Sequence, residues 1–202
     1  MSVPNILATR YASAAMRSIW TPENKIRAER RLWLTVMEAQ ADLGVSFGGD
    51  DPEQVLADYQ AVLDDVDLDS IAEREAITRH DVKARIEEFN ALAGHEHIHK
   101  GMTSRDLTEN IEQMQVLESL RLVRDKMVAT LNQLSRLAAQ FSDQAIAGRS
   151  HNVAAQVTTL GKRFATAIDE MLVAWDHVNE LIERSPARGI KGPMGTAQDM
   201  LD

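Results

Sequence analysis

A histidine, two neighbouring hydroxyl groups and an acidic side chain lie close together in the segment His99–Asn110. Thr103 and Ser104 stand directly before a long helical stretch, where either hydroxyl could cap a helix N-terminus. The same hydroxyls, together with the backbone amides of a helix start, could instead hold a carboxylate. The spacing alone leaves both interpretations open.

Two other polar clusters contain a histidine, namely Arg79-His80-Asp81 and Gly148-Arg149-Ser150-His151. Histidine titrates near neutral pH, so it can give a proton to a poor leaving group such as an amine. His151 could equally satisfy a helix terminus, and Asp81 could favour the dipole at a helix start. Alternatively, His80 and Asp81 could bind a polar heterocycle or orient a leaving group. Together with Thr103 and Ser104, these clusters suggest one site for an anionic substrate.

A further set of imidazoles lies in a predicted loop, where His95, His97 and the His99 already named alternate along the chain. Imidazole nitrogens suit zinc, nickel or copper, and Glu96 lies between two of them. A run of alternating histidines without a distant fourth ligand is a weak signal, and we therefore predict no metal site. No glycine-rich phosphate fingerprint or dinucleotide-binding pattern occurs, so we expect no cofactor.

The elements that must position these groups are predicted to be helices. Aromatic residues make up only 4% of the chain, and Leu, Ala, Met and Glu are plentiful, a composition that favours helices over sheets. No glycine or proline occurs between Gly101 and Gly148. Apolar residues recur at steps of three and four in two stripes, which predict helices of about 30–35 residues, roughly 45–50 Å long. The stripes are Leu117, Leu120, Val123, Met127, Leu131, Leu134, Leu137 and Phe141, then Leu160, Phe164, Ile168, Met171, Trp175, Val178 and Ile182.

We therefore predict an all-α fold with two domains. Residues 1–111 form a small N-terminal helical domain, and residues 112–202 form the first long antiparallel helices of an elongated helical bundle, joined around residues 142–156. Two helices cannot bury stripes of this length by themselves, so we expect further helices from additional sequence or from partner subunits. A glycine-rich loop at 189–196 lies just before the end of the chain, which suggests a fragment of a longer protein.

Charge and composition exclude several classes of function. The net charge of −9 argues against binding to nucleic acid, which would require a basic face. No apolar run approaches the roughly 20 residues of a membrane span, and no secretory signal is recognisable. The chain has no cysteine, so disulfides and thiolate metal sites are excluded. We expect a cytoplasmic protein with no nucleic-acid or membrane partner.

Four motifs that contain these residues follow one another along the chain. Their types and their order resemble the fumarase/aspartase superfamily and, within it, the adenylosuccinate lyase family. They match the first part of a much longer enzyme, and two departures stand out: Arg79 replaces a more usual lysine, and Ser150 replaces a more usual threonine. The motifs are Arg10-Tyr11, Arg79-His80-Asp81-Val82, His99-x-Gly101-x-Thr103-Ser104-x-Asp106, and Gly148-Arg149-Ser150-His151 continuing to Arg163.

The resemblance implies β-elimination without a cofactor. Fumarate would be released from adenylosuccinate, giving AMP, and from the succinylocarboxamide ribonucleotide of purine biosynthesis. Charge accumulates on an aci-carboxylate that needs preorganised donors, and an acid must protonate the departing amine. The resemblance implies that His151 donates the proton with help from His80, and that Thr103 and Ser104 bind a carboxylate. Arg10 and Tyr11 would bind the phosphate, and Arg79 and Asp81 would line the nucleotide site. His99 and Ser150 would support the site.

The resemblance also places the general base on a serine of a Gly-Ser-Ser loop that nothing in these 202 residues matches. It further implies a homotetramer in which three subunits build each site, so we expect the isolated chain to be inactive. The alternatives are another lyase of the superfamily, such as argininosuccinate lyase, or a non-catalytic helical oligomerisation module.

Overall fold

The computed structural model describes residues 5–196, and the fold is helical, as predicted, with one two-stranded sheet among the described residues. The chain divides into two compact units. The first contains the described residues up to Gln115 together with those from Ala187 onward, and the second is Val116–Pro186. The sequence placed the boundary at 111/112 and kept the last segment with the long helices. That segment instead packs with the first unit, because side chains of residues 106–113 bind its backbone.

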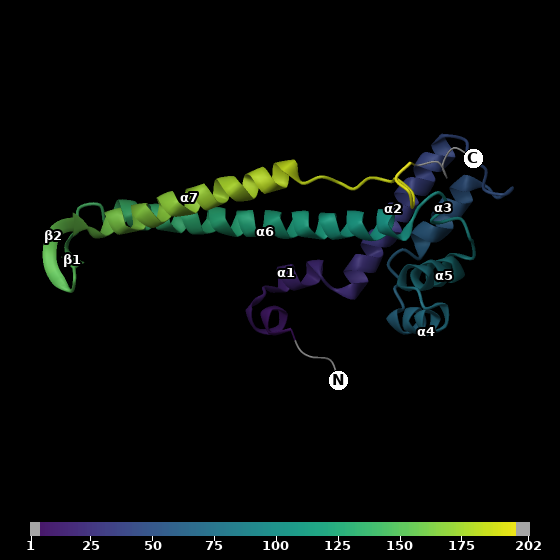
Figure 1. The fold of residues 1–202 in the computed structure, drawn as a ribbon, viewed down its shortest axis with the longest axis horizontal. Helices are drawn as coiled ribbons and strands as arrows, with labels where there is room; N and C mark the ends of the chain where they lie inside the picture. The colour runs from purple at the N-terminus through teal and green to yellow at the C-terminus, as the bar shows by residue number, and fades with distance from the viewer. Residues whose placement is uncertain (1–4, 197–202) are drawn as a thin grey trace. The chain divides into compact units, whose positions relative to one another are not determined.

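Side chains that precede a proline cap two helix starts in the first unit. The Thr21 hydroxyl accepts a hydrogen bond from the backbone of Asn24, and Pro22 occupies the first helical position, where its missing N–H costs nothing. Asp51 caps the helix that begins at Pro52 in the same way. Figure 1 shows the helices, which are η1 Leu7–Tyr11, α1 Ala14–Ile19, α2 Pro22–Asp42, α3 Pro52–Ala61, α4 Leu68–Thr78, α5 Asp81–Ala93 and the start of α6 at Ser104.

An aromatic cluster and a buried ion pair hold α2, α3 and α5 together. Trp33 stacks on Phe89 with ring centroids 6.3 Å apart, and Tyr59 packs on Phe89 at 4.9 Å. The guanidinium of Arg30 donates to both carboxylate oxygens of Glu88, at 2.8 and 2.6 Å, and lies over Phe89. The charges of Arg30 and Glu88 are both buried, so each one offsets the free-energy cost of removing the other from water. This core fixes the start of α5 and the loop that leads to α6.

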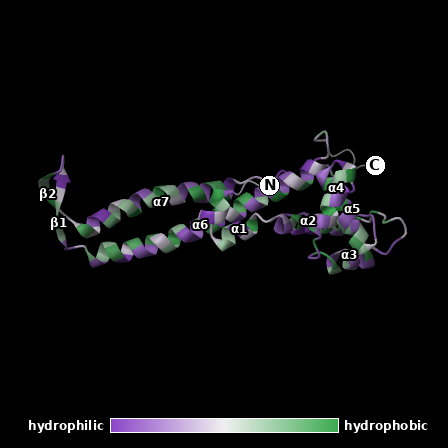
Figure 2. Cartoon of the chain, turned by 90° about the horizontal axis from the view of Figure 1, so that it is seen from below, coloured by the Kyte–Doolittle hydropathy of each residue, from purple (hydrophilic) through white to green (hydrophobic). Residues whose placement is uncertain are grey.

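The second unit contains the remainder of α6 (Ser104–Gln140), strands β1 (Ala145–Ser150) and β2 (Val153–Thr159), and α7 (Leu160–Arg184). Helix α6 has 37 residues and α7 has 25, so one helix is longer and the other shorter than predicted. Hydrophobic and hydrophilic residues alternate along both helices in Figure 2. Most of the predicted stripe positions are half-buried. Across residues 116–186, all of which the structure describes, only Gly161 is fully buried.

The connection between the long helices is a β-hairpin, where the sequence predicted a polar turn. Its two turn residues, His151 and Asn152, have φ of 49° and 63°, the left-handed conformation that a tight two-residue hairpin requires. Ser150 pairs with Val153 across the turn. At Gly148, a Cβ would lie 2.9 Å from the carbonyl oxygen of Gln156, so this strand needs glycine. Among the described helices, none has both the length and the apolar content needed to cross a membrane.

Candidate functional site

His80 and Ser104 meet where α5 and α6 begin. Nδ1 of His80 accepts a hydrogen bond from the backbone N–H of Lys83 at 3.1 Å, so this side chain caps α5. Nε2 lies 3.4 Å from the Ser104 hydroxyl. Because Nδ1 acts as acceptor, the proton of the neutral ring is on Nε2, facing Ser104. His80 thus caps α5 with one nitrogen and faces Ser104 with the other, and its role toward a substrate stays a prediction.

The start of α6 combines a helix cap with a free hydroxyl. The backbone N–H of Thr103 donates to Oδ2 of Asp106 at 3.1 Å, and the N–H of Asp106 donates to the Thr103 carbonyl at 2.9 Å. This carboxylate satisfies the cap as an acidic residue does in a capping box. Within residues 5–196, no hydrogen bond involves the Thr103 hydroxyl. The hydroxyl is therefore available to a ligand at a helix N-terminus, where negative charge is favoured.

Asp106 also attaches the glycine-rich loop of residues 189–195 to this helix start. It is completely buried and accepts hydrogen bonds from the backbone of Lys191 at 3.1 Å and of Gly192 at 2.9 Å. The Arg188 guanidinium lies 3.2 Å from its Oδ1. Burial alone would raise the pKa of Asp106, but these donors lower it below its ordinary value. The carboxylate therefore stays charged and fixes the loop near the two hydroxyls.

A chain of charges behind His80 connects Asp81 to α2. Arg85 donates to Asp81 at 2.9 Å, and its Nε lies 2.7 Å from Oε2 of the buried Glu29. Burial would raise the pKa of Asp81, but the hydrogen bond from Arg85 lowers it overall. Arg79 ends α4 in the left-handed region with φ of 55°. Sequence reasoning missed Arg85 and Glu29, since only the i, i+4 spacing of Asp81 and Arg85 gave any signal.

His99 is held beneath the site by Trp33. The indole N–H of Trp33 donates to Nδ1 of His99 at 3.0 Å, and His99 has a φ of 67°. Burial lowers the pKa of His99, with partial opposition from the charge of Asp106. The imidazole is therefore neutral near pH 7 and carries its proton on Nε2. The support role of His99 stays a prediction.

The other predicted site residues are not joined to this cluster. Arg10 and Tyr11 are exposed at the end of η1, where the guanidinium lies 5.7 Å from the Tyr11 ring centroid. No interaction among the described residues links them to His80 or Ser104. His151 and Ser150 are exposed in the second unit. Their membership of the same site remains a prediction.

Comparison with known proteins shows the family of the chain. A family model described as Lyase matches residues 9–199, and the chain belongs to this lyase family. It is similar to the adenylosuccinate lyase of Saccharomyces cerevisiae, at 33% identity over 96% of the chain and 41% of that protein. The adenylosuccinate lyase of Schizosaccharomyces pombe is 34% identical over the same shares. The resemblance predicted from the motifs is therefore confirmed, and the chain spans about two-fifths of the length of these relatives.

Solved structures confirm the fold. The fumarate lyase of Mesorhizobium sp. BNC1 superposes with a TM-score of 0.80 at 22% identity, over 94% of this chain and 44% of that one. The β-carboxy-cis,cis-muconate cycloisomerase of Acinetobacter calcoaceticus sp. ADP1 superposes with a TM-score of 0.83 at 18% identity, over 98% of this chain and 47% of that one. At these identities, the likeness supports the helical architecture and no particular reaction.

Proposed function

We propose that this chain contributes part of the active site of an adenylosuccinate lyase. The enzyme would cleave a C–N bond by β-elimination, releasing fumarate from adenylosuccinate to give AMP, and would treat the succinylocarboxamide ribonucleotide of purine biosynthesis in the same way. The observation that carries the proposal is the placement of His80 Nε2 beside Ser104 at the start of α6. The 33% identity of the chain to the adenylosuccinate lyase of Saccharomyces cerevisiae supports the choice of reaction.

The start of α6 is suited to bind the carboxylate on which charge accumulates. The free Thr103 hydroxyl, the Ser104 hydroxyl and the helix N-terminus would donate hydrogen bonds that strengthen as the aci-carboxylate forms. Because His99 is neutral and the charge of Asp106 is compensated by Arg188 and by backbone donors, this part of the site adds little net negative charge. His80 would contribute an Nε2 proton to the same region.

The remaining roles are assigned by family position. His151 would give a proton to the departing amine, assisted by His80, since imidazole titrates close to neutral pH. The other roles are phosphate binding by Arg10 and Tyr11, lining of the nucleotide site by Arg79 and Asp81, and support by Ser150 next to His151.

The general base would be a serine on a loop outside these 202 residues, and the complete enzyme would be a homotetramer. The second unit supports assembly, because its helices leave large apolar side chains exposed, with Leu172 at 44%, Val173 at 55% and Leu181 at 58%. A lone helix pair rarely leaves so much apolar surface in water without a partner. The cytoplasmic location remains a prediction from the sequence.

The test is fumarate release in a chimera in which residues 9–196 replace the matching segment of the Saccharomyces cerevisiae relative. We expect turnover of adenylosuccinate but not of argininosuccinate, and none by the purified 202-residue chain. Ser104→Ala and His151→Ala should each lower kcat by about 10²–10⁴, whereas Ser135→Ala on the exposed side of α6 should not. A folded chimera that uses argininosuccinate, or a chain that turns over alone, would contradict the proposal.

A further inference from the structure

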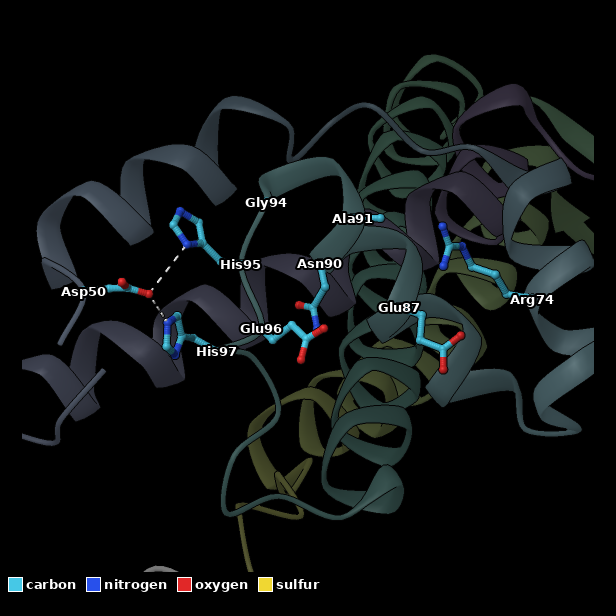
Figure 3. Close-up of a pocket in the computed structure, with 9 residues that line it drawn as sticks. All are labelled: Asp50, Arg74, Glu87, Asn90, Ala91, Gly94, His95, Glu96 and His97. Carbon is cyan, nitrogen blue, oxygen red and sulfur yellow. Dashed lines mark hydrogen bonds and ion pairs between the residues drawn. The ribbon is translucent and has the colours of Figure 1, made fainter. Parts of the chain in front are cut away.

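Asp50, His95 and His97 converge in the first unit, and none of them is among the residues assigned to the lyase reaction. Oδ2 of Asp50 lies 2.8 Å from Nε2 of His97 and 4.0 Å from Nδ1 of His95. One ligand atom from each residue lies within 4.8 Å of the others. Figure 3 shows the carboxylate between the two rings, at one end of a cavity of about 610 Å³.

The orientation of His95 is the one that metal-binding histidines adopt. Its Nε2 lies 2.8 Å from Oδ2 of Asp58. An ionised carboxylate requires the proton on Nε2, which leaves the Nδ1 lone pair free on the side of Asp50. A carboxylate that fixes the tautomer of a histidine is the usual outer partner in metal sites.

The third histidine of the loop is excluded from the cluster. Nδ1 of His99 accepts a hydrogen bond from Trp33, so this ring is committed to the core. The cluster therefore has two imidazoles from one loop and one carboxylate from another.

We propose that Asp50, His95 and His97 bind a divalent transition metal ion, with zinc as the preferred ion. Two imidazoles and one carboxylate are a zinc donor set that leaves a fourth position for water. Tetrahedral zinc with ligands at about 2.0–2.2 Å needs donor atoms roughly 3.3–3.5 Å apart. The His97–Asp50 contact must therefore open by roughly half an ångström and the His95–Asp50 contact must close by a similar amount. Rotation of the exposed Asp50 side chain can provide both changes.

In the metal-free protein, the position of Lys100 opposes the binding of an ion. Its Nζ lies 2.9 Å from Nδ1 of His97, which places a positive charge near the site and keeps the ring proton on Nε2. Coordination through Nε2 moves that proton to Nδ1, so the ammonium group must leave. Lys100 is exposed and can turn into solvent. The bound ion would tie the loop around Asp50 to the loop that leads into Thr103 and Ser104.

Zinc titration of the 202-residue chain, with any histidine tag removed, tests the proposal by calorimetry. We expect one equivalent to bind, His95→Gln and His97→Gln to abolish binding, and Asp58→Asn to weaken it about 10- to 100-fold. Lys100→Gln should bind zinc more tightly, a gain that a damaged fold cannot produce. His177→Gln, an exposed histidine on α7, is the matched control and should bind as the unmodified chain does.

A second measurement needs no variant. Zinc should slow the reaction of His95 and His97 with diethyl pyrocarbonate, read by peptide mass mapping, while the rate at His177 stays unchanged. Absence of one-to-one binding, retention of binding in folded His95→Gln and His97→Gln proteins, or equal reaction rates with and without zinc would overturn the proposal. The cluster would then be a hydrogen-bonded surface network only.

Discussion

Glu29 is a buried carboxyl group whose ionisation opposes folding of the first unit. It is completely buried on α2, and although Nε of Arg85 lies 2.7 Å away, neither carboxylate oxygen has an aligned hydrogen-bond donor among the described residues. Burial raises its pKa from 4.5 to about 7, against the opposing charges of Arg85 and Lys25. An ionised Glu29 is therefore poorly compensated, and the folded chain binds its proton more tightly than the unfolded chain.

The difference between the two pKa values corresponds to about 3 kcal/mol. Because the folded-state pKa is the higher one, the associated stability is present at about pH 4 and is lost as the pH rises through about 7. Replacing Glu29 by glutamine removes this titration. The free energy of unfolding of Glu29→Gln, measured relative to the unmodified chain, should therefore rise by about 3 kcal/mol between about pH 4 and about pH 8.

Urea unfolding followed by tryptophan fluorescence gives this difference. In a Trp20→Phe, Trp175→Phe background, only the buried Trp33 reports, and it lies in the core of the first unit. Glu38→Gln, an exposed glutamate on the same helix, serves as the control and should show no pH-dependent difference of this size. A Glu29→Gln difference that stays constant with pH, or that falls as the pH rises, would refute the reasoning.

Three other perturbations follow from single contacts. Arg30→Met leaves the buried Glu88 without its partner, so the free energy of urea unfolding should fall by about 3–5 kcal/mol; a change below 1 kcal/mol would contradict this. Gly161→Ala places a Cβ against the carbonyl oxygen of Ala138 and 2.8 Å from backbone atoms of Phe141, and should cost about 1–3 kcal/mol in the thermal unfolding of the second unit; unaltered melting would show that α7 shifts freely. Asp106→Asn weakens the charged anchor of the 189–195 loop, so trypsin should cut after Lys191 faster than in the unmodified chain, and an equal rate would count against the anchor.

The helices were predictable because their signals are local. Thr21 and Pro22 mark a helix start through their own chemistry, and the apolar stripes have a period that only a helix can use. The hairpin at residues 145–159 was missed, because its turn uses His151 and Asn152 in left-handed conformations where sequence rules expect asparagine followed by glycine.

The candidate site was predictable only in its pieces. The residue types around His80 and Ser104 indicated a polar site, but their contact depends on how the starts of α5 and α6 pack, which no local pattern encodes. Asp50 shows the same limit. A metal interpretation of His95 and His97 lacked a distant ligand, and the carboxylate that could supply it lies 45 positions earlier in the sequence. Buried groups such as Glu29 reveal their altered chemistry only once their surroundings are known.

The hydrogen bond from Trp33 to His99 affects what mutagenesis of this loop can report. With Nδ1 occupied and the proton on Nε2, His99 has a donor and no free lone pair, and its low pKa keeps it from acquiring a second proton. It therefore cannot pass a proton in either direction while the bond holds. Loss of activity on replacing His99 would measure lost hydrogen-bond donation, and the shape of the pH–rate profile should be the same with and without it.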